Sequence, residues 1–131
     1  HETSVTHSIF KILAENSLVL ARLNLNNGEY EILKRDYRLH GRGLELEHDF
    51  ESYNRRILDE KLIHPDDEER YRARITLSSL HNFFFDGKKQ LSYQFCRQLN
   101  NKYIPTVMEF FAGNRCDVQN PWIVVLIREI S

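Results

Sequence analysis

The spacing of the apolar residues changes once along this chain, and this change restricts the fold more than any other feature. From residue 48 to residue 85, apolar side chains recur every three or four positions, which is the period of an amphipathic helix. From Leu91 to Leu99 they alternate with polar residues, which is the period of a strand with one buried face. Helices and strands in separate stretches predict an α+β fold.

Three helices are predicted in the middle of the chain. The first spans His48–Leu62, the second begins at Pro65, and the third begins after Thr76. A threonine side chain can accept a hydrogen bond from the first free N–H groups of a helix, so Thr76 is the expected cap of the third. Asp86-Gly87 should end that helix, because glycine adopts the left-handed conformation found there.

The start of the second helix carries a strong local signal. Pro65 has its φ angle fixed near the helical value and has no N–H to leave unsatisfied, so it suits the first helical position, with His64 as the N-cap. Four acidic residues follow in the first turn and three arginines lie further along, as the helix dipole favours. The alternative is a metal site at His64, Asp66 and Asp67, but no second histidine lies at ligand spacing, so we expect no metal.

The N-terminal part should form one helix and one hairpin. Apolar residues within Ser4–Glu15 fall at helical spacing, which predicts a short amphipathic helix. Leu18–Leu25 and the segment from Tyr30 are strand-like, and Asn26–Gly28 between them is typical of a tight hairpin turn with positive φ angles. Lys34–Glu47 is polar, has no clear period, and is expected to be a loop.

Three strands are predicted after the helices. Cys96 should lie on the face of the first strand opposite its apolar residues. Asn100–Lys102 is a predicted turn, and Tyr103–Ala112 returns as a strand in which Pro105 indicates a bulge or an edge position. The last strand is Trp122–Ile130.

The last strand should be central in its sheet. It is apolar on both faces from residue 122 to residue 127, and a strand of this kind is covered on both sides. We therefore expect the helices on one face of the sheet. The N-terminal helix or a second subunit should cover the other.

Composition sets limits on size and partners. The 131 residues, 41% hydrophobic and 28% charged, suit one soluble domain at 17–131 behind the helix at 1–16. The formal net charge is −1 and the basic residues are dispersed, so the chain has no positive patch that would attract nucleic acid, and we expect no nucleic-acid partner. Cys96 and Cys116 are too few for a disulfide scaffold, and no apolar run approaches the roughly 18 residues of a membrane span. We expect a cytoplasmic domain that is excised from a longer protein, and that longer protein could be membrane-anchored.

Three segments resemble the PAS-like sensory modules that precede GGDEF-type diguanylate cyclases, or histidine kinases, in bacteria. Residues 21–31 are similar to the family's first strand and "D-x-x-T-G-x-Y" turn, with Asn24 and Asn27 in place of Asp and Thr. Residues 63–70 match "hHPDDxxR". Residues 127–131 are similar to the "D-I-T" ending, with Glu129 and Ser131 substituted.

The resemblance implies a fold and a function. The fold is a five-stranded antiparallel sheet in the order 2-1-5-4-3, with the helices across one face. The function is that of an input domain that binds a small ligand or a partner, is typically a homodimer, and controls a C-terminal output domain in cyclic di-GMP or kinase signalling.

Neither of the common cofactors of this family is expected. The flavin-binding relatives use "N-C-R-x-L-Q" on a helix, whereas residues 114–116 are a scrambled Asn-Arg-Cys in a late loop. Haem-binding relatives need an axial histidine; His81 is in a comparable place, but an exposed loop histidine is the simpler interpretation. No nucleophile pair or phosphate loop is present, so no catalytic residue is assigned.

Six residues are candidates to line a ligand pocket. They combine apolar walls with hydroxyl groups and one cation: Tyr53, Tyr71, Tyr93, Phe95, Arg97 and Met108. The alternative is that the rings simply fill the core. Arg97 interrupts the apolar face of its strand, so it could pair with a ligand carboxylate or lie solvated at the rim.

Two other functions remain open from the sequence. One is a ligand-free dimerisation module that uses the N-terminal helix and the outer sheet face. The other is a small cone-shaped α+β enzyme, which would need a buried acid facing the pocket, and Glu109 is the one acid in the apolar alternations that could serve.

Overall fold

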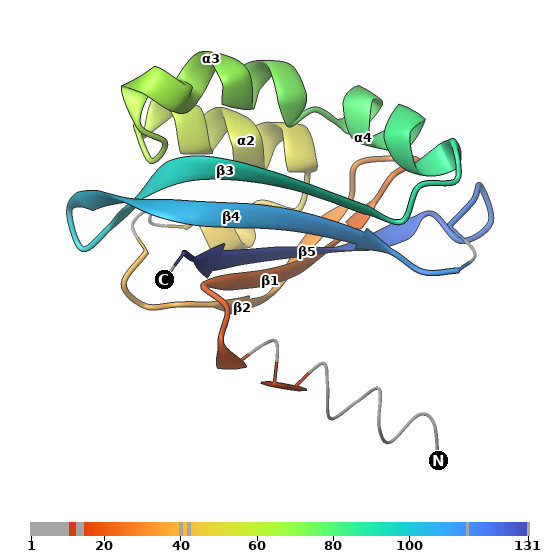
Figure 1. Ribbon diagram of the computed structural model, residues 1–131, viewed down its shortest axis with the longest axis horizontal. Helices are drawn as coiled ribbons and strands as arrows, with labels where there is room; N and C mark the ends of the chain where they lie inside the picture. The colour runs from red at the N-terminus through yellow and green to blue at the C-terminus, as the bar shows by residue number, and fades with distance from the viewer. Residues whose placement is uncertain (1–10, 13–14, 40, 42, 115, 131) are drawn as a thin grey trace.

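The computed structural model describes residues 11–12, 15–39, 41, 43–114 and 116–130. Figure 1 shows an antiparallel sheet with the helices packed across one face. The elements follow in the order β1 (Val19–Asn24), β2 (Tyr30–Arg35), a 3₁₀ turn η1 (Leu44–Leu46), α2 (Phe50–Asp59), α3 (Pro65–Arg74), α4 (Leu77–Phe85), β3 (Gln90–Leu99), β4 (Lys102–Ala112) and β5 (Trp122–Glu129).

The sheet has five strands in the order β2-β1-β5-β4-β3, and all neighbouring pairs are antiparallel. The α+β class and the strand order are therefore confirmed. β5 is central, as its two-sided apolar pattern predicts. Its residues Ile123, Val125 and Ile127 are at most 2% exposed and pack in the core on the helix side.

The opposite face of the sheet is also apolar at its centre. Leu20, Val107 and Leu126 alternate with the core-facing residues of their strands, and all three are buried. The predicted cover for this face, the helix at Ser4–Glu15, lies largely outside the described residues. Of its apolar positions the structure describes Ile12, which is helical and 58% exposed.

The helix starts are set by side-chain caps. The His64 Nδ1 atom accepts a hydrogen bond of 3.0 Å from the Asp66 N–H, with Pro65 in the first turn, and Thr76 Oγ1 accepts one from Ser79. These two predicted caps are confirmed. α2 is shorter than the predicted His48–Leu62, because it ends at Asp59 and Lys61 takes a positive φ of 57°.

The two hairpins differ in how they turn. Asn100 and Asn101 both have positive φ, 52° and 65°, and join β3 to β4 in a tight turn, as predicted. The hairpin predicted around Asn26–Gly28 is present, but its turn is wider than the tight turn that was predicted. The loop spans residues 25–29, with positive φ at Gly28 alone, because the Asn24 side chain accepts from the N–H groups of the next residues and widens the loop.

Two further predictions need correction. Pro105 marks neither an edge strand nor a bulge: β4 is interior and its pairing with β3 is regular. The missing N–H is tolerated because Pro105 lies just beyond the last paired residue of β5, where its carbonyl accepts from Ile130. The segment 34–47 is not all loop either, since β2 extends to Arg35 and η1 follows.

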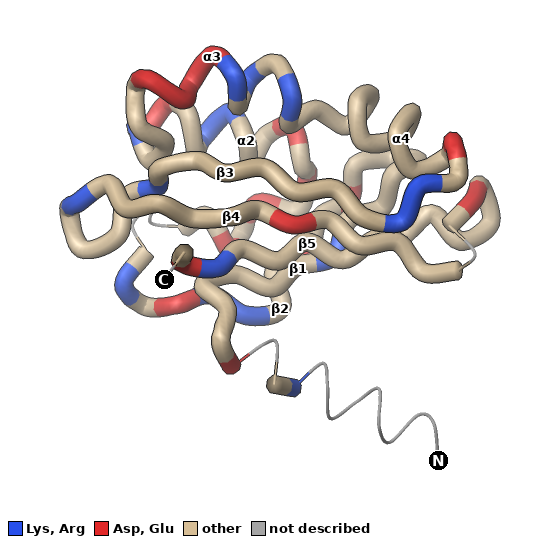
Figure 2. Tube along the Cα trace, in the orientation of Figure 1, with Lys and Arg blue, Asp and Glu red and all other residues tan. Residues whose placement is uncertain are grey.

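Acidic and basic residues are interspersed over most of the described chain, but along α3 they are separated. Figure 2 shows acidic residues at the start of this helix and basic residues towards its end, as its sequence requires. None of the described helices is long and apolar enough to cross a membrane.

Candidate ligand site between the sheet and the helices

Five of the six predicted pocket residues meet between the sheet and the helices. Tyr53 of α2 and Tyr71 of α3 face Phe95, Arg97 and Met108 of β3 and β4, and each is at most 3% exposed. Tyr93 is on the same face but only partly buried, with its ring 6.0 Å from that of Phe95. The sequence therefore placed these residues on the correct faces. In the structure they pack against one another.

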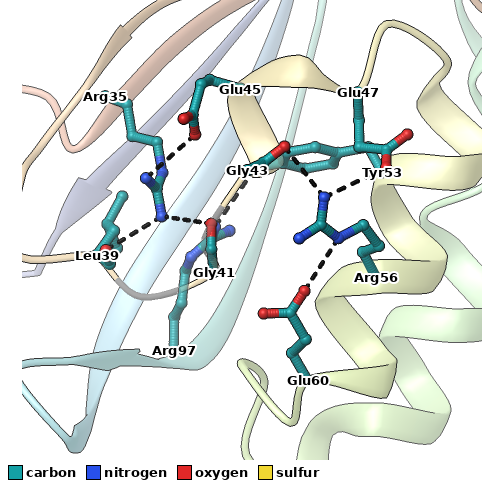
Figure 3. Close-up of polar contacts among 10 residues, drawn as sticks. All are labelled: Arg35, Leu39, Gly41, Gly43, Glu45, Glu47, Tyr53, Arg56, Glu60 and Arg97. Carbon is teal, nitrogen blue, oxygen red and sulfur yellow. Dashed lines mark hydrogen bonds and ion pairs between the residues drawn. The ribbon is translucent and has the colours of Figure 1, made fainter.

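Arg97 is the unusual member of this group. It is 2% exposed, and its Nη2 donates a hydrogen bond of 3.4 Å to the Tyr53 hydroxyl (Figure 3). Among the described residues, no carboxylate forms an ion pair with it. The alternative that placed Arg97 in solvent at the rim is wrong.

The backbone explains why this arginine is buried. β3 is an edge strand, but residues before α3 lie along it: the His64 N–H donates to the Cys96 carbonyl, and the Gln98 N–H donates to that of Leu62. An isolated bridge pairs Ile63 with Arg97 itself. Arg97 thus has neighbouring backbone on both sides, and α2 lies above it.

Two other arginines fix the segment that connects β2 to α2. Arg35 donates to the carbonyl groups of Leu39 and Gly41 and pairs with Glu45. From the other side, Arg56 of α2 donates to the Gly43 carbonyl and pairs with Glu47 and with Glu60, the residue that follows the helix (Figure 3). These arginines have the anionic partners that Arg97 lacks.

Tyr30 belongs to the site and is absent from the predicted set. It is fully buried, and its ring centroid lies 4.7 Å from that of Tyr53 and 5.4 Å from that of Phe50. Its hydroxyl makes no hydrogen bond to any described residue. The sequence contains one indication of this position. Tyr30 and Ile32 are two residues apart on β2, so both side chains lie on the face of the sheet that the helices cover.

Asn54 was also missed, because the helix pattern was read from its apolar positions alone. Its Oδ1 accepts a hydrogen bond of 2.8 Å from the Tyr71 hydroxyl, and its Nδ2 donates weakly, at 3.4 Å, to the Ile75 carbonyl. This amide is 5% exposed and ties α2 to α3 inside the protein. A polar residue next to Tyr53 on the buried side of α2 was the signal.

The hydroxyl groups of Tyr30 and Tyr71 stay protonated. Burial, followed by the neighbouring tyrosines, raises the pKa of Tyr30 well above its ordinary value. Burial and then Tyr53 likewise raise the pKa of Tyr71. At neutral pH the Arg97 guanidinium therefore keeps its positive charge beside the neutral hydroxyls of Tyr30 and Tyr71.

Helix α3 is held to the edge of β3 by side chains. The Asp67 carboxylate accepts a hydrogen bond of 2.8 Å from the Cys96 N–H, and Arg70 donates to the Gln94 carbonyl. Arg70 also lies 4.4 Å above the Phe95 ring. Asp67 thus does more than favour the helix dipole, since it satisfies a backbone group of the edge strand.

Open cavities lie on both sides of α3. One of about 230 Å³ is lined by Phe95, Arg70 and Cys96, among others. A second, of about 200 Å³, lies between α2 and α3 and reaches Asn54 and Tyr71. Phe95 lines the first cavity and Tyr71 the second, and their rings are 5.0 Å apart, whereas Arg97 lines neither cavity.

Other candidates from the sequence lie elsewhere. Glu109 is on the outer face of the sheet, where it pairs with Arg128 at 2.8 Å, so it does not face the interior. His81 is partly buried on α4, with its ring 4.2 Å from that of Phe85, so its interpretation as an exposed loop histidine is wrong. Within the described ranges, no three His, Cys, Asp or Glu side chains are grouped to hold a metal ion.

Comparisons with known proteins give no assignment: a scan against protein-family models finds no match, and a search of curated proteins finds none.

Proposed function

We propose that the chain is a PAS-like sensory input domain, in which a small molecule binds between the sheet and the helices and controls an output domain of the same protein. The diguanylate cyclases and histidine kinases of bacteria are the output domains that the sequence resemblance suggests. The observation that carries the proposal is the buried polar cluster of Arg97, Tyr53 and Tyr30, in which a guanidinium has no anionic partner and a hydroxyl has no partner among the described residues.

The fold supports the same proposal. The sheet order and the position of the helices over one face are those that the resemblance implies. The polar cluster lies in the layer between them, where a ligand would contact both. A core that served stability alone would gain by replacing such groups with apolar ones.

Helix α3 is the element through which binding would act. Apart from Tyr71 it buries no residue of its own, and its hydrogen bonds to β3 come from Asp67 and Arg70. A ligand that displaces Tyr71 would shift these hydrogen bonds along β3, which is linked through β4 to the central strand β5. Binding changes the output only if the ligand prefers one of the two arrangements.

A screen by thermal shift tests this proposal. The 131-residue chain would be melted with a library of neutral, cationic and anionic metabolites, and each compound that raises the Tm would be confirmed by calorimetry. Bound ligand stabilises the folded state in proportion to the logarithm of its concentration over its Kd, so a true ligand shows a dose-dependent Tm. A library without a single saturable binder would refute the proposal.

A second candidate is a dimerisation module without a ligand. It is favoured by Phe111, Trp122 and Val124, which remain partly exposed on the outer face of β4 and β5. Sedimentation of the whole chain, with Val124→Lys as the disrupted variant, decides it. A monomer at high micromolar concentration would exclude this function.

The small-enzyme alternative loses its support. It required Glu109 to face the interior, and this carboxylate lies on the outer face in an ion pair.

A further inference from the structure

Arg97 differs from the other arginines in where its charge is placed. Six described arginines pair with a carboxylate, and their side chains are between 19% and 48% exposed: Arg22, Arg35, Arg38, Arg56, Arg70 and Arg128. Arg97 is 2% exposed and pairs with none of the described carboxylates. Three other described arginines, Arg55, Arg72 and Arg74, also form no ion pair, but they are exposed. Arg97 is therefore the one described arginine that is both buried and without a counter-charge, although burying an unpaired charge is costly.

Its protein neighbours leave this charge uncompensated. A guanidinium has five N–H donors, and the structure gives Arg97 one side-chain hydrogen bond, at the long distance of 3.4 Å, to Tyr53. Burial holds the pKa of Tyr30 and Tyr71 above their ordinary value, so these hydroxyls are neutral at physiological pH. An anion from outside the described chain is the chemical group that would complete the site.

We infer that the ligand of this site is a small monocarboxylic acid with an apolar body, whose carboxylate binds Arg97 and accepts a hydrogen bond from the Tyr30 hydroxyl. This inference rests on the function proposed above and specifies its ligand class. A planar carboxylate matches the two parallel N–H groups of the guanidinium fork. The rings of Phe50, Phe95 and Tyr53 are apolar walls for the remainder of the molecule.

Charge and space restrict the class further. One buried cation balances one negative charge, so a phosphate dianion would leave a net negative charge in the interior. Arg97 lines neither of the cavities of about 200 and 230 Å³ beside α3, but Tyr71 lines the smaller one and Phe95 the larger one. Displacement of Tyr71, a residue of the weakly buried helix α3, would open the path. A molecule of the size of benzoate or hexanoate suits this space.

The test uses pairs of probes that differ in charge alone. Benzoate and hexanoate, with benzamide and hexanamide as neutral controls and inorganic phosphate as a second anion, would be titrated into the 131-residue chain by calorimetry and by ¹H–¹⁵N spectra that include the arginine side chains. We expect each acid to bind at least about 10-fold more tightly than its amide, and phosphate to bind no better than the amides.

Variants assign the effect to the site. Arg97→Met should abolish the difference between acid and amide, whereas Arg22→Met, which removes an arginine from the outer face, should leave it unchanged. Tyr30→Phe removes only the unpartnered hydroxyl and should weaken acid binding several-fold while the fold is retained. This second variant keeps the test valid if Arg97→Met fails to fold.

Each other outcome overturns the inference. Equal binding of acid and amide, or binding that survives in both Arg97→Met and Tyr30→Phe, shows that another class of ligand is recognised. Tighter binding of phosphate shows the same. No binding of any probe at about 10 mM, while the metabolite screen finds another ligand, refutes the carboxylate class and leaves the sensory function standing.

Discussion

Replacing Arg97 with methionine should make the ligand-free protein more stable. The side chain is 2% exposed, so its charge is removed from water in the folded state. The effective penalty for a buried ion is several kcal/mol, whereas a hydrogen bond to a charged group contributes about 1.5–3 kcal/mol and the bond to Tyr53 is long at 3.4 Å. Methionine has a similar length and adapts to irregular apolar space.

The net expected change is a gain of about 1–3 kcal/mol in the free energy of unfolding of Arg97→Met. Urea unfolding followed by circular dichroism measures it, provided that the slope m is the same in both proteins. Two controls separate the causes. Arg22→Met removes an exposed, ion-paired arginine and should cost about 0–1 kcal/mol. Arg97→Lys keeps the buried charge but loses the planar guanidinium group, so its free energy of unfolding should not exceed that of the unmodified protein.

A loss of stability in Arg97→Met would refute this reasoning. If the variant were destabilised by more than about 1 kcal/mol, the guanidinium would be satisfied by the folded protein and would need no anion. A gain, in contrast, is the behaviour of a functional residue that is retained at the expense of stability.

Three further predictions concern the ties that hold the fold. Asp67→Ala should lose about 1–3 kcal/mol in urea unfolding, because a part-buried N–H of β3 loses its acceptor, whereas Asp66→Ala, whose side chain is 91% exposed, should lose much less. Thr76→Ala should lose about 1 kcal/mol of stability and fray the start of α4 in hydrogen exchange. The hydrogen bond from Arg38 lowers the folded-state pKa of Asp36, so this pair contributes stability above the unfolded pKa that is lost as the pH falls; Asp36→Asn should reduce the acid-induced drop in the urea midpoint.

Features that depend on neighbouring residues could be predicted from the sequence. The His64 and Thr76 caps and the Asn100-Asn101 turn are local chemistry, and the structure has them as expected. The central position of β5 also follows from a local pattern, since six successive apolar residues need cover on both faces. The strand order came from the resemblance of the sequence to a family.

Features that depend on distant contacts could not be predicted. The bond between Asp67 and the Cys96 N–H joins residues 29 apart, and an acidic residue in a helix start gives no sign of it. The burial of Arg97 depends on the bridge from Ile63, and alternation alone cannot tell a buried arginine from one at a rim. Asn54 could not be assigned to the site for the same reason, because its hydrogen-bond partners Tyr71 and Ile75 are distant in the sequence.

The most direct test of the central claim, that the interior at Arg97 receives a ligand, is a titration of the ¹⁵N-labelled chain with hexanoate. The account predicts that the Arg97 side-chain signal shifts and saturates together with the backbone amides of α3 around Tyr71. Shifts confined to exposed arginines, or an unchanged Arg97 signal at saturating probe, would contradict it.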